Sequence, residues 1–168
     1  MSPVLQLRLT LTAVIGLAYW LFGNLYEAIV FSPNWVRDSP DQFTRLDGFF
    51  TVTGPTLYFV PLTPLVLVLV WLLWWRNRDE DLVPDYRRAA LAALILTALT
   101  AYIVAAVVSQ MFGADALARP ENLNAAAWRW NVLNIVRMIL TAATAWFMFN
   151  AFRKLDRRTG TGRRPEQD

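Results

Sequence analysis

WRWNVLNIVR, residues 128–137, opens the last apolar segment of the chain. It places the guanidinium of Arg137 about two turns inside a stretch that otherwise has the composition of a membrane-spanning helix. A charged side chain near the centre of a bilayer costs at least about 2.5 kcal/mol, so it normally faces the bundle interior and has a partner. Trp130, Asn134 and Arg137 share one helix face, which Thr141 extends. The stretch is therefore predicted to be a helix whose polar face is turned into a bundle.

The remaining apolar residues fall in blocks rather than in alternation, and 56% of the 168 residues are hydrophobic. A helix needs about 20 apolar residues to cross the hydrocarbon core of a bilayer. Four segments meet this requirement: residues 9–31, 54–75, 89–112 and 125–152. They predict an all-α fold, a four-helix transmembrane bundle. Residues 1–155 are expected to form one membrane domain, and residues 156–168 a disordered basic tail.

The basic residues are distributed unevenly among the loops. They are concentrated in the N-terminus, in the loop between the second and third segments, and in the C-terminal tail. Because cytoplasmic loops carry the excess of lysine and arginine, both termini are predicted to be cytoplasmic, in the inner (plasma) membrane. The basic tail is interpreted as a topology and anionic-lipid signal. Membrane lipid is therefore an expected partner, and nucleic acid is not.

The chain contains no cysteine and no histidine. The first absence excludes disulfides, thiolate catalysis and thiolate-ligated zinc or iron–sulfur clusters. The second excludes imidazole-ligated metals and removes the commonest general base. We therefore expect neither a metal nor a cofactor.

Polar and aromatic residues gather in one half of the predicted bundle. With the N-terminus inside, that half is the outer one, and the inner half is almost purely apolar. This asymmetry predicts a partly hydrated pocket open toward the outer leaflet or the outer surface. The candidate ligand-binding residues are Trp20, Asn24, Tyr58, Tyr102, Gln110, Trp130 and Asn131.

Glu27 is the expected counter-ion of Arg137. It shares a face of the first segment with Gly16, Gly23 and Asn24, and small residues at such spacing let helices approach closely. We expect the two charged side chains to lie within salt-bridge distance or one water molecule apart. Such a pair either belongs to a binding site or serves only to fix helix packing.

Two irregular features are expected at the outer end of the bundle. Residues 32–53 form a long loop that mixes prolines with aromatic residues, which is typical either of a lid over the bundle or of an interfacial turn. Pro61 and Pro64 lie well inside the second segment and predict a kink there, because proline removes a backbone donor.

Two motifs resemble a known family. NLYEAIVFSP (residues 24–33) closes the first segment, and WNVLNIVR (residues 130–137) opens the last. A glycine-rich first span that ends in an acidic residue shortly before a proline, together with W-x-x-x-N-x-x-R, resembles the four-helix membrane family that includes the fungal anthrone oxygenases. The resemblance covers the whole chain in outline and points to Glu27, Trp130, Asn134 and Arg137. It implies oxidation of a polyketide anthrone by molecular oxygen, without metal or flavin.

Cofactor-free oxygenation needs a base, a group that holds an oxyanion, and an apolar wall for a flat substrate. The candidate catalytic residues are Glu27 as the base, with Arg137 and Asn134 as the anion holders. The expected ligand is an apolar aromatic small molecule that carries a phenol or a quinone-like oxygen. Alternatives are a small proton-coupled transporter built around Glu27 and an accessory or structural membrane subunit. The sequence leaves the substrate and the formation of a homo-oligomer open.

Overall fold

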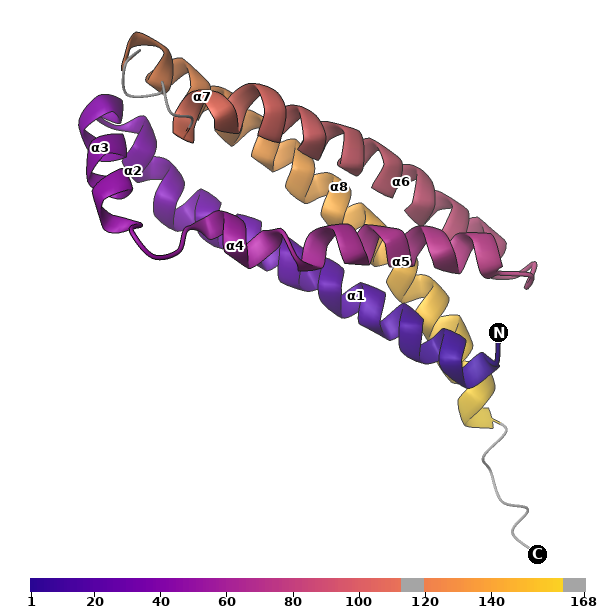
Figure 1. Ribbon diagram of the computed structural model, residues 1–168. Helices are drawn as coiled ribbons and strands as arrows, with labels where there is room; N and C mark the ends of the chain where they lie inside the picture. The colour runs from indigo at the N-terminus through magenta and orange to yellow at the C-terminus, as the bar shows by residue number, and fades with distance from the viewer. Residues whose placement is uncertain (113–119, 162–168) are drawn as a thin grey trace, which may run out of the picture.

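The computed structural model describes residues 1–112 and 120–161, which contain helices and no strand (Figure 1). The elements are α1 (Pro3–Tyr26), the π-helical turn η1 (Glu27–Phe31), α2 (Ser32–Val36), α3 (Ser39–Phe49), α4 (Pro55–Phe59), α5 (Leu62–Arg76), α6 (Val83–Tyr102), the π-helical turn η2 (Ile103–Val108), α7 (Ser109–Phe112) and α8 (Pro120–Thr161).

Within these residues, four helical stretches are long and apolar enough to cross a membrane. They are Pro3–Val36, Leu57–Arg76, Val83–Phe112 and Glu121–Gly160. The predicted all-α, four-helix transmembrane bundle is confirmed. The first, third and fourth stretches extend beyond the apolar segments at one end or both, because polar residues that flank an apolar block can continue its helix outside the hydrocarbon core.

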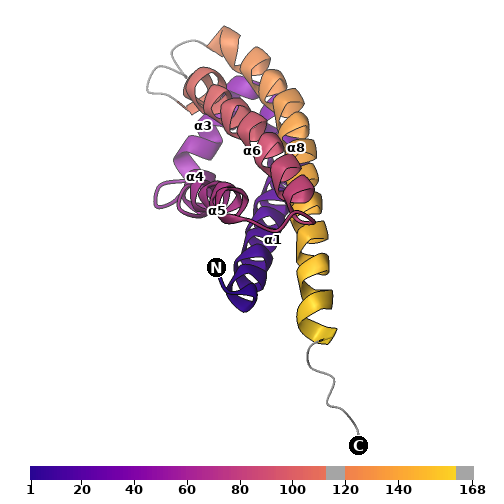
Figure 2. The ribbon, with the colours of Figure 1, turned by 90° about the vertical axis from the view of Figure 1, so that its right-hand side faces the viewer.

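The bundle has the up-and-down arrangement of sequential antiparallel helices. Helix α1 packs against α8 and α5, and α6 packs against the same two helices, so that α5 and α8 lie diagonally opposite each other (Figure 2). We call the end that holds α2, α3 and α7 the cap end. The opposite end, where α1 starts and α8 finishes, is the terminal end (Figure 1).

Glycines set the close approach between α1 and the α4–α5 helix. A Cβ atom at Gly16 would overlap a methyl group of Val66. A Cβ atom at Gly23 would lie 2.6 Å from the Tyr58 ring and 2.8 Å from the Phe59 ring. The small residues of the first segment therefore do let a neighbouring helix approach closely, as expected in lipid.

The long loop expected over residues 32–53 is largely helical instead. Helices α2 and α3 cover most of it, and each of these helices has a proline in its first turn, where the missing N–H costs no hydrogen bond. Trp35 and Phe43 are 3% and 2% exposed and pack in one cluster with Trp130 of α8 and Met111 of α7. The segment is therefore a helical hairpin packed on the cap end of the bundle.

The kink predicted in the second segment is confirmed. Helix α4 ends at Phe59 and α5 begins at Leu62, so the helix is interrupted beside Pro61. The hydroxyl of Thr63 donates to the carbonyl oxygen of Phe59 at 3.1 Å. This bond satisfies a backbone acceptor next to the break, as membrane helices require.

The first residues of the expected disordered tail are helical. Helix α8 continues through Thr161, because Arg158 forms ion pairs with Asp79 and Asp81 that hold its last turns against the loop between α5 and α6. The expectation of disorder is therefore wrong for residues 156–161. Residues 162–168 lie outside the described part of the chain.

Candidate functional site

The polar face of α8 is turned into the bundle, as predicted. Trp130, Asn134 and Arg137 are 4%, 1% and 8% exposed, and Thr141 and Thr144 are fully buried. The hydroxyl of Thr141 donates to the backbone oxygen of Arg137 at 2.8 Å, so it needs no other partner. On this face, Asn134 and Arg137 are therefore the residues whose polar side chains can contact other helices or a ligand.

Two asparagine side chains hold the guanidinium of Arg137. Its Nη2 donates to Asn24 Oδ1 at 2.5 Å and to Asn134 Oδ1 at 2.6 Å, and its Nε donates to Asn134 Oδ1 at 3.1 Å. Hydrogen bonds that involve a charged group are roughly twice as strong as neutral ones. Since Asn24 belongs to α1 and Arg137 to α8, these bonds join the two helices.

Backbone contacts fix the orientation of both amides. Asn24 Nδ2 donates to the Trp20 carbonyl oxygen at 3.0 Å, and Asn134 Nδ2 donates to the Asn24 carbonyl oxygen at 3.4 Å. Each amide nitrogen thus has a backbone partner, and each amide oxygen is left to accept from the guanidinium. The oxygen of Asn134 thus contacts Arg137, and its expected role in holding an oxyanion stays a prediction.

Glu27 is not the direct partner of Arg137. Its side chain is only 8% exposed and its charge interacts with that of Arg137, yet no ion pair within 4.0 Å joins them among the described residues. Asn24 lies one turn earlier on the same face of α1, and its side-chain oxygen accepts a hydrogen bond from the guanidinium in place of the Glu27 carboxylate. A contact through one water molecule stays a prediction.

The cluster keeps unused hydrogen-bonding capacity. Within the described part of the chain, neither Nη1 of Arg137 nor the carboxylate of Glu27 makes a hydrogen bond with another residue. The guanidinium also lies over the ring of Trp130, with 5.9 Å between its Cζ and the ring centroid. A cationic donor, a carboxylate acceptor and an aromatic face thus meet between α1 and α8.

The other predicted ligand-binding residues divide into two groups. Trp20 is buried beside this cluster, and Asn131, half-buried, accepts a hydrogen bond from Ser32 toward the cap end. Three residues lie elsewhere, exposed on the surface of the bundle: Tyr58, Tyr102 and Gln110. Tyr58 stacks on Tyr19 with 4.2 Å between ring centroids. The expectation that these three line an interior pocket is wrong.

The lack of contrast between helix faces explains these misplacements. Along α6 and η2, exposed and buried positions alike are mostly occupied by alanine, leucine, isoleucine and valine, so the sequence does not reveal which face turns inward. In the second span, the helix is interrupted beside Pro61, so the inward face of α5 does not predict the inward face of α4. The spacing of residues in the sequence therefore does not predict whether Tyr58, Tyr102 and Gln110 face the bundle interior or its surface.

An aromatic cluster closes the site toward the cap end, and its members were not predicted as site residues. Trp35 of α2 meets Trp130 edge to face, with 4.7 Å between ring centroids, and stacks on Phe43 of α3 at 6.4 Å. Phe112 of α7 meets both Trp35 and Phe43 edge to face. In the sequence, Trp35 and Phe43 belong to the proline- and aromatic-rich stretch that follows the first segment, and Phe112 ends the third segment.

Two π-helical turns lie in the half of the bundle nearer the cap end. Glu27 is the first residue of η1, and η2 continues α6 toward α7. Single π-helical turns inside α-helices are frequent at functional sites, because the extra residue per turn changes which side chains face the neighbour. Neither turn has a recognisable sequence signal, so both were missed.

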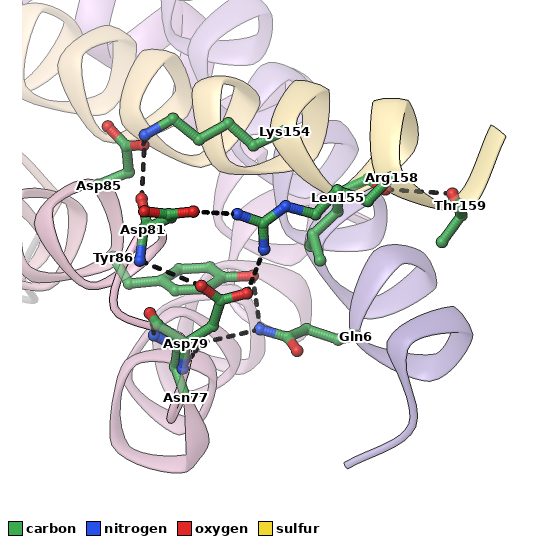
Figure 3. A network of polar contacts seen from close by, with 10 residues as sticks. All are labelled: Gln6, Asn77, Asp79, Asp81, Asp85, Tyr86, Lys154, Leu155, Arg158 and Thr159. Carbon is green, nitrogen blue, oxygen red and sulfur yellow. Dashed lines mark hydrogen bonds and ion pairs between the residues drawn. The ribbon is translucent and has the colours of Figure 1, made fainter. Parts of the chain in front are cut away.

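A second polar network lies at the terminal end (Figure 3). Lys154 Nζ donates to Asp85 Oδ2 at 2.6 Å, and Arg158 Nη2 donates to Asp81 Oδ2 at 2.5 Å. Close by, the hydroxyl groups of Thr10 and Tyr86 are 2.7 Å apart. Apart from Thr10, these residues flank the four apolar segments, so the network does not test the expectation that this half of the segments is almost purely apolar. Lys154 and Arg158 lie one turn apart on α8, and this spacing in the sequence indicates that both side chains lie on one helix face.

Comparison of the chain with protein-family models, with curated proteins and with solved structures finds no match, so the candidate site stands on its own geometry.

Proposed function

We propose that the chain binds an amphipathic aromatic molecule, with a phenol or quinone-like oxygen, at the cluster of Asn24, Glu27, Asn134 and Arg137. One observation carries this proposal: two neutral amides, rather than a carboxylate, hold the guanidinium. An amide oxygen positions a guanidinium without cancelling its charge. Arg137 can then attract a partially negative oxygen inside the bundle, where such an interaction is stronger than in water.

The chemistry of the unused groups narrows the ligand class. Arg137 offers N–H donors to a carbonyl or phenolate oxygen, Glu27 offers an acceptor to a hydroxyl group, and Trp130 offers an aromatic surface. A sugar or a nucleotide needs more donors and acceptors than this cluster provides. A flat ring system with one or two oxygens fits, and it can reach a membrane-embedded site from the lipid.

The same arrangement supports a cofactor-free oxygenase similar to the anthrone oxygenases. Glu27 would accept a proton from the acidic carbon of the substrate, and Arg137 would stabilise the oxyanion that forms. Molecular oxygen would then supply one atom to that carbon and release the other as water, which converts an anthrone into the quinone. Asn24 and Asn134 would act by positioning Arg137.

We expect Arg137→Met to weaken binding of such ligands by about tenfold or more, because a hydrogen bond to a charged group contributes about 1.5–3 kcal/mol. Titration of an anthrone, a phenol and a quinone into the purified protein in nanodiscs measures the effect. Phe49→Ala, at a position that is 76% exposed, is the control and should bind nearly as well as the wild type.

A second candidate, a structural or accessory subunit, is favoured by the bonds through which Arg137 joins α1 to α8. If the wild type and Arg137→Met bind the ligands equally, or neither binds them, the binding proposal fails. Arg137 then has the packing role. A thermal melt of each variant shows that the comparison is made on folded protein.

We also propose that the chain lies in the inner (plasma) membrane with both termini cytoplasmic, as the distribution of basic residues favours. A fluorescent protein fused after Asp168 should then fluoresce, and alkaline phosphatase fused at the same place should be inactive. Active phosphatase at that position would contradict this orientation.

A further inference from the structure

A groove at the terminal end lies between the start of α1 and the end of α5. Its volume is about 270 Å³. It is lined by Met1, Leu5, Leu9, Leu72, Leu73 and Arg76. This volume lies just below the range of about 300–1,000 Å³ that is usual for small-molecule sites. Five apolar side chains and one arginine in a narrow groove suit a single hydrocarbon chain attached to an anion.

Arg76 lies where lipid headgroups are expected. It is the last residue of α5 and follows Trp74 and Trp75, which are 46% and 68% exposed. Exposed tryptophans at a helix end mark the boundary between hydrocarbon and headgroups. The guanidinium lies over the Trp75 ring, with 5.4 Å between Cζ and the ring centroid.

The charge of Arg76 has no carboxylate partner in residues 1–112 and 120–161. Two basic residues of α8 at the same end differ in this respect, since Lys154 is paired with Asp85 and Arg158 with Asp79 and Asp81. The positive charge of Arg76 can therefore be balanced by an anion from outside the chain.

We propose that this groove binds an anionic phospholipid of the adjoining leaflet. One acyl chain lies along Leu5, Leu9 and Leu72, and the phosphate pairs with Arg76. The apolar lining explains why the occupant is a lipid rather than a free phosphate, and the arginine explains why the lipid is anionic. The site is separate from the cluster around Arg137 and does not depend on its proposed function.

The test is native mass spectrometry of the protein released from an equal mixture of phosphatidylglycerol and phosphatidylcholine with identical acyl chains. The wild type should retain phosphatidylglycerol preferentially. Arg76→Gln should reduce that preference about fivefold, the effect typical of one basic residue at an anionic surface. Arg78→Gln, an exposed arginine two residues away that does not line the groove, is the matched control and should leave the preference unchanged.

A second variant tests the groove itself. Leu72→Trp fills it from a partly exposed position and should reduce retention of both lipids, while Arg137→Met should retain them as the wild type does. Equal loss of preference in Arg76→Gln and Arg78→Gln would overturn the proposal in favour of a diffuse charge effect. Displacement of the lipid by millimolar inorganic phosphate would overturn it in favour of a headgroup-only site.

Discussion

Replacement of Asn24 by alanine is expected to lower the free energy of unfolding by about 1.5–3 kcal/mol. The substitution removes the oxygen that accepts from Arg137 Nη2 at 2.5 Å and leaves that side of a buried guanidinium without a partner. The loss is a helix-to-helix contact, because the donor and the acceptor come from α8 and α1. Denaturant titration of the protein in mixed micelles measures it.

Asn34→Ala is the matched control. Asn34 is exposed, and its Nδ2 donates to the carbonyl oxygen four residues earlier, as that of Asn24 does, but it has no guanidinium partner among the described residues. Its replacement should change stability by less than about 0.5 kcal/mol, as usual for surface positions. Equal losses in the two variants would show that the local backbone bond, rather than the contact with Arg137, is what Asn24 contributes.

A double-mutant cycle isolates the contact itself. Asn24→Ala combined with Arg137→Met should cost less than the sum of the single losses by about 0.5–3 kcal/mol, because neither side chain is then left alone. The same cycle with Glu27→Gln should give a smaller coupling, since no direct bond joins Glu27 to Arg137. A larger coupling to Glu27 would mean that the charge pair holds the helices together.

The second large effect is expected at Gly16. Gly16→Ala should destabilise the protein by about 1–3 kcal/mol, because the added methyl group meets the buried Val66 at a distance that side chains do not tolerate. Val66→Ala in the same chain opens space at that point and should recover part of the loss. Thermal melts of the two single variants and of the double variant measure both effects.

Gly48→Ala provides the control for the glycine experiment. A Cβ atom at Gly48 meets nothing within 4 Å, so this change should be neutral or should stabilise α3 by up to about 1 kcal/mol. If Gly16→Ala were equally harmless, α5 would have to shift away from α1 at little cost. The close approach of the two helices would then be a weak constraint.

The four spans could be predicted because each is a block of apolar residues of the length that a bilayer requires. The inward facing of Arg137 followed from the cost of exposing it to lipid. Its partner could not be chosen by the same argument. Asn24 and Glu27 lie one turn apart on one face of α1, and the offset between α1 and α8 depends on packing along their whole length.

Other features depend on contacts between distant parts of the chain. Prolines that suggested an irregular loop instead begin α2 and α3, because Trp35 and Phe43 find a buried place against α8. The ion pairs of Lys154 and Arg158 extend α8 beyond its apolar part. The sequence shows where these basic residues are, but it does not predict that acidic residues some 70 positions earlier lie close enough to pair with them.

The length of α8 has a mechanical consequence. Its 42 residues span about 63 Å at about 1.5 Å per residue, roughly twice the thickness of the hydrocarbon core. This one rod is tied at three heights: Asn124 donates to Val36 near the cap, Arg137 donates to Asn24 in the middle, and Lys154 binds Asp85 at the far end. Because all three attachments lie on one continuous helix, a rotation of α8 about its own axis would have to change all three together.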